Sequence, residues 1–256
     1  MDVVVCLKQV PARDAALRLS PAGNWIETFD ASPEMNEPDA YALEEALRLK
    51  ERHGGSVTAF SAGPPEAASV LREALAKGAD AAVLIEGEGL EQADPLRTAR
   101  LLAAGIRRKP FDLVLTGLQS DDAGFGQTGV VLAELLDVPH AAIVVEIAAE
   151  GDRLTVKQEL EAGWFQKVEM TAPALLTIQS GINKVRYATL MGIKKARTKP
   201  LERIPAAELG VSVEPAQKIA KLYAPQKSKQ TQMLTGSAKE QAEALVEKLR
   251  FEARVL

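Results

Sequence analysis

The sequence is poor in the residues that build disulfide frameworks and metal centres. It has one cysteine, Cys6, and two histidines, His53 and His140, among 256 residues. A single thiol forms no internal disulfide, and these three side chains are too few for a conventional structural zinc site. We therefore expect a cytoplasmic protein whose fold depends on neither disulfides nor zinc.

Long apolar runs and an excess of positive charge are also missing. No apolar stretch reaches the ~18 residues of a membrane span, and the N-terminal MDVVVCLKQV lacks the charged start and the apolar length of a signal peptide. Lys and Arg total 31 against 35 Asp and Glu, a net charge of -4. This balance gives no general attraction to polyanions, so we expect no nucleic-acid partner and no membrane insertion.

The composition that is present is that of a globular protein, with 46% hydrophobic and 26% charged residues. The charge is unevenly distributed, because residues 191–256 carry a net +6 and the preceding 190 residues a net -10. We predict an α/β domain over residues 1–190 and an extended basic C-terminal arm over residues 191–256. The arm is rich in proline and polar residues until a last helical stretch, Ala238–Leu249, and such a stretch does not build its own core.

The first part of the chain alternates short β-branched runs with longer segments of helical spacing, a pattern typical of a parallel sheet covered by helices. The predicted strands are Val3–Leu7, Val57–Ser61, Ala82–Ile85, Leu113–Thr116 and Ala142–Val145. The predicted helices are Pro38–His53, Pro65–Lys77, Leu96–Arg107 and Gln127–Leu136. Two further runs, Arg153–Glu159 and Gln166–Met170, flank Ala162-Gly163 and indicate an added antiparallel β-hairpin, whose place in the sheet the pattern leaves open.

Ligands of an open parallel sheet collect at the carboxyl ends of its strands. Four loops fall there: Leu7-Lys8-Gln9, Asn36–Asp39, Ala62-Gly63-Pro64 and Gly117–Gly129. The last contains the spacing Gly124-x-Gly126-x-x-Gly129, in which glycines allow close approach to a phosphate at a helix N-terminus. Three interpretations stay open: a mononucleotide phosphate cradle, a simple flexible loop, and a dinucleotide fingerprint, which would ordinarily follow the first strand.

Other polar residues have ordinary structural interpretations. Asn36 is suited to cap the helix that follows it, Cys6 to be a small buried apolar residue, and Asp121-Asp122 to form a turn. The sequence contains no HExxH, GxSxG, GxxxxGK[ST] or CxxC motif. We therefore predict a nucleotide site with no catalytic residue and no metal.

Six stretches together resemble the β subunit of electron-transfer flavoprotein. In family order they are VVVCLKQVP, MNEPDAYALEEALRLKE, SAGP, LREALAKGADAA, DLVLTGLQSDDAGFGQTG and INKVRYATLMGIKKARTKP. The resemblance implies a Rossmann-like, parallel-sheet domain that binds an adenine nucleotide, with a C-terminal arm that wraps an α subunit in a heterodimer.

The resemblance also implies cofactors and the residues that hold them. Structural AMP would bind in this chain, and FAD would lie mostly on the α subunit at the interface. The implied cofactor-binding residues are Cys6, Asn36, Glu37, Pro38, Asp39, Ala62, Gly117, Leu118, Gln119, Ser120, Asp121, Asp122, Ala123, Gly124, Phe125, Gly126, Gln127 and Thr128. The protein would position a flavin that carries the electrons and would supply no acid–base chemistry.

Family members dock flavin dehydrogenases through a recognition loop with a leucine anchor, which implies Leu190, with Arg186 and Tyr187, inside Ile182–Arg197. The alternative is that Leu190 packs within its own arm. The chain departs from the family pattern at Asn183–Arg186, where Asn-Glu-Pro-Arg is usual, at Gly126, where many members have asparagine, and at Ala12-Arg13, where an acidic residue is common. These departures bear on partner identity, on nucleotide contacts and on the flavin environment.

The implied function is an electron carrier subunit that passes electrons from flavin dehydrogenases, such as the acyl-CoA dehydrogenases of fatty acid oxidation, toward a quinone-linked oxidoreductase. One alternative is a bifurcating flavoprotein that holds a second FAD in place of AMP and is reduced by NADH. Alternatives of other classes are a stand-alone nucleotide-binding stress or sensor protein, for which the basic arm has no use, and an ATP-cleaving ligase or synthetase, which would need a pyrophosphate loop and metal ligands.

Overall fold

The computed structural model describes residues 1–27, 32–212, 214–225 and 231–255. The chain divides into two units, Met1–Leu222 and Tyr223–Leu256. The first unit contains the α/β fold and the second contains helix α6 (Ala238–Glu247) and a π-helical turn, Lys248–Glu252. The division falls 32 residues later than the predicted end of the domain at residue 190. Residues 213, 226–230 and 256 of the predicted arm lie outside the described residues.

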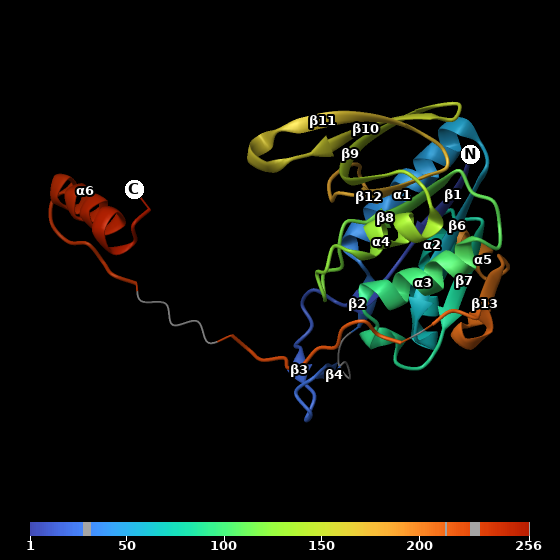
Figure 1. Ribbon diagram of the computed structural model, residues 1–256, viewed down its shortest axis with the longest axis horizontal. Helices are drawn as coiled ribbons and strands as arrows, with labels where there is room; N and C mark the ends of the chain where they lie inside the picture. The colour runs from blue at the N-terminus through green and yellow to red at the C-terminus, as the bar shows by residue number, and fades with distance from the viewer. Residues whose placement is uncertain (28–31, 213, 226–230, 256) are drawn as a thin grey trace. The chain divides into compact units, whose positions relative to one another are not determined.

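A central sheet organises the first unit (Figure 1). Its strands are β1 (Asp2–Cys6), β6 (Ser56–Gly63), β7 (Ala81–Glu86), β8 (Leu113–Gly117), β9 (His140–Glu150), β10 (Arg153–Glu159), β11 (Phe165–Thr171), β12 (Ala174–Ile178) and β13 (Leu201–Pro205). Within the described residues these nine strands follow the order β11-β10-β9-β12-β8-β1-β6-β7-β13. Pairing is parallel from β9 through β13, while β9, β10 and β11 pair antiparallel.

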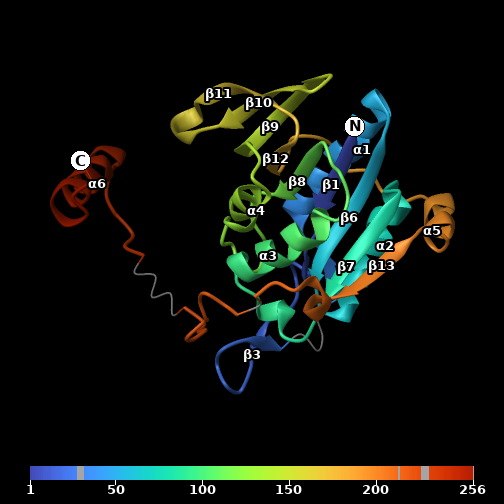
Figure 2. The same ribbon diagram turned by 45° about the vertical axis from the view of Figure 1, so that its right-hand side comes forward.

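Helices cover both faces of this sheet, as parallel strands require (Figures 1 and 2). The helices of the first unit are α1 (Glu37–His53), α2 (Ala68–Lys77), α3 (Pro95–Ile106), α4 (Thr128–Leu136) and α5 (Leu190–Ala196). Buried side chains of α1, α2 and α5 join one apolar cluster, and those of α3 and α4 join another. The fold is therefore a three-layer α/β sandwich, which confirms the predicted class.

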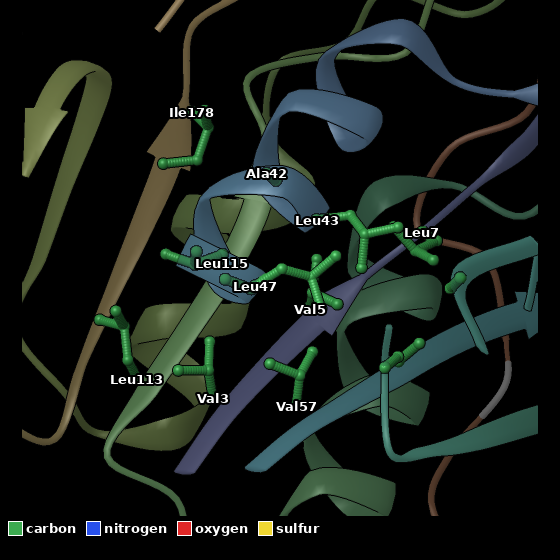
Figure 3. Close-up of a cluster of buried hydrophobic side chains, with 14 of the residues drawn as sticks. Val3, Val5, Leu7, Ala42, Leu43, Leu47, Val57, Leu113, Leu115 and Ile178 are labelled. Carbon is green, nitrogen blue, oxygen red and sulfur yellow. The ribbon is translucent and has the colours of Figure 1, made fainter. Parts of the chain in front are cut away.

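Strand β1 shows how the sequence builds both clusters. Val3 and Val5 point to the α1 side, and Val4 and Cys6 to the α3 side, because successive strand residues face opposite sides of the sheet. Figure 3 shows Val3 and Val5 beside Leu43 and Leu47. All four of these side chains are buried, so a run of apolar residues forms the central strand.

Most predicted elements are present. Each of the five predicted strands overlaps an observed strand, and each of the four predicted helices overlaps an observed helix. The antiparallel hairpin is confirmed as β10 and β11, with β9 on the other side of β10. The main helical part of Ala238–Leu249 is confirmed as α6, whose N-terminus has a capping box between Ser237 and Glu240.

Three of the elements that were not predicted belong to the main sheet or to its helical layers. Strand β12 inserts between β8 and β9, and the arm contributes helix α5 and strand β13. Strand β13 pairs with β7 through main-chain bonds and buries Ile204, so part of the predicted arm extends the main sheet. Helix α5 and strand β13 therefore belong to the α/β fold, although the prediction ended that domain at residue 190.

Candidate functional site

A cavity lies where β1, β6 and β8 end. It collects residues from all four loops that the sequence places at the carboxyl ends of strands. Those that line it are Cys6, Leu7, Lys8, Asn36, Asp39, Ala62, Gly117, Leu118, Gln119, Ser120, Ala123, Phe125, Gly126, Gln127, Thr128 and Gly129. Its position at the carboxyl ends of parallel strands is that of a small-molecule site in an open α/β sheet.

Five of the predicted cofactor residues lie outside this lining: Glu37, Pro38, Asp121, Asp122 and Gly124. The acidic ones support the loops instead of facing the cavity. Asp121 accepts a bond from the Glu37 amide at 3.3 Å, and Asp122 accepts one from Lys8 Nζ at 2.6 Å. Glu37 pairs with Arg13, which also lies 4.0 Å from Asp121.

One wall of the cavity was missed from the sequence. It consists of a 3-10 turn, Leu90–Gln92, and the start of α3, and it contributes Leu90, Glu91, Ala93, Pro95, Thr98 and Leu102. This segment follows β7, and Asp94 within it caps α3 by accepting from the Arg97 amide at 2.7 Å. The sequence did offer one signal for this wall. The loop follows the predicted strand Ala82–Ile85, so, like the four predicted loops, it lies at the carboxyl end of a strand.

Asn36 fastens the glycine-containing loop to α1. Its Nδ2 donates to the Gln119 carbonyl oxygen at 2.9 Å, and its Oδ1 accepts from the Asp121 amide at 2.9 Å. The side chain makes no cap bond to α1, so the prediction that Asn36 caps this helix is wrong. Both the donor and the acceptor of its side-chain amide therefore bond to residues 83 to 85 positions further along the chain.

Asp39 joins the ends of two strands from the first turn of α1. Its Oδ2 accepts from the Lys8 amide at 2.7 Å, and its Oδ1 accepts from the Gly117 amide at 3.0 Å. Burial raises the pKa of Asp39 to about 7, although both amides favour the ionised carboxylate. A Cβ at Gly117 would lie 2.4 Å from Oδ1, so only glycine fits beside this carboxylate.

Positive potential at the cavity comes from one side chain and one helix end. Among the described lining residues, Lys8 is the only one with a cationic side chain, and its Nζ lies 2.6 Å from Asp122 Oδ1 and 3.3 Å from Ser120 Oγ. Burial opposes ionisation of Asp122, but Lys8 holds the pKa of that carboxyl below its usual range. Helix α4 begins at the cavity with Thr128, and Gln127 before it makes no side-chain cap bond. The first amides of α4 therefore keep the unpaired N–H groups that bind anions.

The three spaced glycines have different physical reasons. Gly124 and Gly126 have φ of +64° and +63°, a left-handed conformation that glycine adopts without strain. A Cβ at Gly129 would lie 2.5 Å from Thr177 Cγ2 and 2.7 Å from Thr116 Oγ1. Gly129 thus lets the first turn of α4 pack directly on β8 and β12, which aims the helix N-terminus at the cavity.

A second cavity adjoins the first. The two share Lys8, Ala62, Leu90 and Glu91 as lining residues. The second is lined in part by residues of two short antiparallel ladders, β2 (Gln9–Pro11) with β5 (Pro33–Met35) and β3 (Arg18–Leu19) with β4 (Ile26–Glu27). The second cavity extends the space at this edge of the sheet beyond the first.

Comparison with known proteins identifies the family. A family model described as the electron transfer flavoprotein domain matches residues 25–209. The chain is 36% identical to "Electron transfer flavoprotein subunit beta" of Methylophilus methylotrophus, over 96% of this chain and 97% of that one. The chain belongs to the family of electron transfer flavoprotein β subunits. The human β subunit is 34% identical over 100% of this chain and 99% of its own.

A relative with a different printed name is "Acryloyl-CoA reductase electron transfer subunit gamma" of Anaerotignum propionicum. It is 34% identical to this chain, over 97% of this chain and 98% of its own length. Flavin-linked electron transfer is thus the common theme of the family. None of the helices in the described residues is long and apolar enough to cross a bilayer.

Within this β-subunit family member, the predicted docking residues lie in the stretch Ile182–Arg197, which we call the docking segment. Leu190 is 82% exposed and Tyr187 92% exposed. Leu190 therefore does not pack inside its own unit. Arg186 is turned toward α1, where its guanidinium contacts Glu44 and Glu51.

Proposed function

We propose that this chain is the β subunit of a heterodimeric electron transfer flavoprotein that binds AMP in the cavity at the carboxyl ends of β1, β6 and β8. With its α subunit it would hold FAD at their interface and pass electrons from flavin dehydrogenases toward a quinone-linked oxidoreductase. The observation that carries the proposal is the convergence of four loops on one cavity at the N-terminus of α4. We place this activity in the cytoplasm, where one buried thiol needs no disulfide partner.

The residues present fit an adenine mononucleotide. The amides that open α4, the Thr128 hydroxyl and Lys8 offer donors and positive charge for a phosphate. Phe125, which is 41% exposed in the lining loop, offers an aromatic face of the kind on which bases stack. Asn36 and Asp39 tie the loops of the site together through their bonds to Gln119 and Gly117.

The chain's own contribution is to bind and orient. Bound FAD would supply the electron chemistry through its isoalloxazine ring. Cys6 lines the cavity, but burial raises the pKa of its thiol far above neutrality, so it stays protonated. Asp39 is engaged by two main-chain amides. These contacts support a structural nucleotide site without a nucleophile or a general base.

A second candidate is FAD in the same cavity, as in a bifurcating flavoprotein reduced by NADH. Two observations favour it. An added Cβ at Gly126 would meet only the Leu118 carbonyl, at 4.0 Å, so the position is open, and the adjoining cavity offers room for the flavin half. AMP and the adenylate half of FAD would use the same loops, so the occupant decides between the two functions.

Nucleotide content tests this directly. The chain is coexpressed with its α subunit, and the purified complex is denatured so that released nucleotides can be counted by chromatography. About one AMP and one FAD per complex is the expected result. Two FAD and no AMP would establish the second candidate, and a monodisperse β chain saturated with nucleotide without α would favour a stand-alone sensor.

We further propose that Leu190 contacts the partner dehydrogenase. An exposed leucine on an anchored segment is suited to fill an apolar pocket of a partner. Leu190→Ala should slow reduction of the heterodimer by an acyl-CoA dehydrogenase and leave AMP and FAD content unchanged. The matched control is Leu160→Ala, which shortens another exposed leucine, in the turn after β10. Equal rates for wild type and Leu190→Ala at limiting heterodimer would refute the docking role.

A further inference from the structure

The docking segment is fastened at both of its ends, and its most exposed side chains lie between the two attachments. The first attachment is to α1 and the second is to α2. Tyr187 and Leu190 lie between them. The contacts of each attachment are specific enough to assign roles to single residues.

The first attachment is an ion-pair network on α1. Arg186 donates through Nε to Glu44 Oε2 at 2.8 Å and through Nη1 to Glu51 Oε1 at 2.6 Å, and its amide donates to Glu44 Oε2 at 3.1 Å. Glu44 is 4% exposed and also accepts from Arg48 at 2.9 Å. Forked, partly buried pairs of this kind are more directional than surface ion pairs.

Asn183 reinforces the first attachment. Its Nδ2 donates to the Tyr41 carbonyl at 3.0 Å and to Glu45 Oε2 at 3.1 Å. Both acceptors lie on α1, one turn before Glu44 or beside it. Residues 183 to 186 thus follow the surface of α1 through side-chain and main-chain bonds.

The second attachment is a close contact between helices α5 and α2. A Cβ at Gly192 would lie 2.2 Å from the Ala76 carbonyl oxygen, so the two helices touch there through backbone. Arg72 Nη1 donates to the Ala196 carbonyl at 2.9 Å, and Lys199 Nζ donates to the Leu75 carbonyl at 3.0 Å. These bonds hold α5 and the residues after it on α2.

Between the attachments, Thr189 caps α5 by accepting from the Gly192 amide at 3.0 Å. The cap places Leu190 at the first position of α5, with 82% of its surface exposed. An exposed side chain has little packing of its own to fix its place. Its position is therefore set by the backbone on either side.

We infer that Arg186, held by Glu44 and Glu51, and Gly192, seated against Ala76, are positioning residues that present Leu190 at a fixed place to the partner dehydrogenase. The inference rests on the proposed docking function. A binding segment that is already fixed before association loses less conformational entropy when it binds. Loosening either end should therefore weaken docking while Leu190 itself stays intact.

The test uses the heterodimer with Arg186→Met, Glu51→Gln and Gly192→Ala. Glu51 is an exposed residue, so Glu51→Gln loosens the first attachment without leaving a buried charge. Gly192→Ala raises intrinsic helix propensity, so any loss of function comes from crowding by the new Cβ, which would lie 2.2 Å from the Ala76 carbonyl oxygen and 3.2 Å from Thr189 Oγ1. The control is Arg203→Met, which removes the Arg203–Glu86 pair at 2.7 Å on strand β13.

Two readouts separate positioning from general stability. Hydrogen exchange of residues 182–197 should speed up in the three variants and stay unchanged in the control. With an acyl-CoA dehydrogenase at saturating acyl-CoA and the heterodimer varied, KM for the heterodimer should rise about tenfold for Arg186→Met, which corresponds to about 1.4 kcal/mol, with kcat nearly unchanged.

A double-mutant cycle with Leu190→Ala supplies the decisive comparison. If Arg186 acts by placing Leu190, Arg186→Met should add little to KM once Leu190 has been shortened. Full additivity, or unchanged exchange in the docking segment of all three variants, would overturn the inference. If Leu190→Ala alone leaves KM unchanged, the docking function is refuted. Hydrogen exchange of residues 182–197 would then still show whether the two attachments hold the docking segment.

Discussion

Replacing Asn36 with aspartate distinguishes two roles for this side chain. A helix N-cap accepts a hydrogen bond, and Asp and Asn are nearly equivalent there. A loop clamp needs a donor and an acceptor at once, and Asn36 uses Nδ2 toward Gln119 and Oδ1 toward Asp121. An Asn36→Asp substitution keeps the acceptor and removes the donor. It should therefore be harmless if Asn36 is a helix cap and destabilising if Asn36 is a loop clamp.

The structure sets the size of the effect. Asn36 is 1% exposed, and its Nδ2 lies 2.9 Å from the Gln119 carbonyl. The substitution places a carboxylate oxygen against that carbonyl and leaves a buried acceptor without its donor. Such a group costs about 1–3 kcal/mol, and we expect about 2 kcal/mol. At ~2–4 °C per kcal/mol for a chain of this size, the thermal midpoint should fall by about 4–8 °C.

The assay is calorimetry of the nucleotide-saturated heterodimer at pH 8, with hydrogen exchange of loop 117–129 as a local readout. The control is Asn24→Asp, which adds the same charge where the side chain accepts from Ser20 Oγ at 3.3 Å. Asn36→Asp should speed exchange in the loop, and the control should not. A midpoint within about 1 °C of the wild type, with unchanged exchange, would refute the clamp and restore the capping role.

Three further predictions concern the same cavity. Gly129→Ala should cost about 1–3 kcal/mol and lower nucleotide content, because the new Cβ would overlap Thr177, and calorimetry with nucleotide counting measures both effects. Asp39→Asn should flatten the pH dependence of stability. Since burial raises the native pKa of Asp39 to about 7, the native state binds the extra proton between pH 4 and 7, and wild-type stability should fall with rising pH there, by at most ~1.4 kcal/mol per pH unit. Gly126→Asn should leave the midpoint nearly unchanged, since asparagine tolerates φ near +63° and the site is open, and should raise the ratio of AMP to FAD in the purified complex.

Each of these predictions has a control or a contrary result. Gly63→Ala is the control for the stability effect of Gly129→Ala, because its Cβ would approach only Ala67 Cβ, at 3.3 Å. Thermal midpoints of the wild type and Asp39→Asn that run parallel from pH 5 to 8 would contradict the titration argument. An unchanged nucleotide ratio in Gly126→Asn would show that this side chain does not select the ligand.

The sheet and its main helices could be predicted because their apolar periodicity is strong. Strand β12 was missed although every residue of Ala174–Ile178 is buried, because a short apolar run at the end of a pattern resembles a connection. Strand β13 was missed because most of its residues are not buried. Leu201–Pro205 is an edge strand in which only Ile204 is buried, and it follows a proline, so its pairing with β7 left little trace in the sequence.

The candidate site, too, could be predicted only in part. The four predicted loops reach one cavity because the carboxyl ends of parallel strands converge, which is a general property of the fold. The bonds of Asn36 could not be predicted, since an asparagine before a helix is explained equally well by a local cap. The wall at Leu90 follows Gly87 and Gly89 and lies among acidic residues, but it has no three-glycine spacing like that of loop 117–129. Hydrogen-bond partners that are distant in the sequence, and the apolar wall of the cavity, therefore could not be predicted from the sequence.

Helix α1 links the two functional regions. Its 17 residues extend about 25 Å at ~1.5 Å per residue. At its start, Asn36 and Asp39 hold the loops of the cavity, and further along Glu44 and Glu51 hold Arg186 of the docking segment. Because a helix packed on the sheet is stiff, these contacts attach both regions to one rigid element. The acidic and amide side chains at the start of α1 and along it thus fix the geometry of both regions.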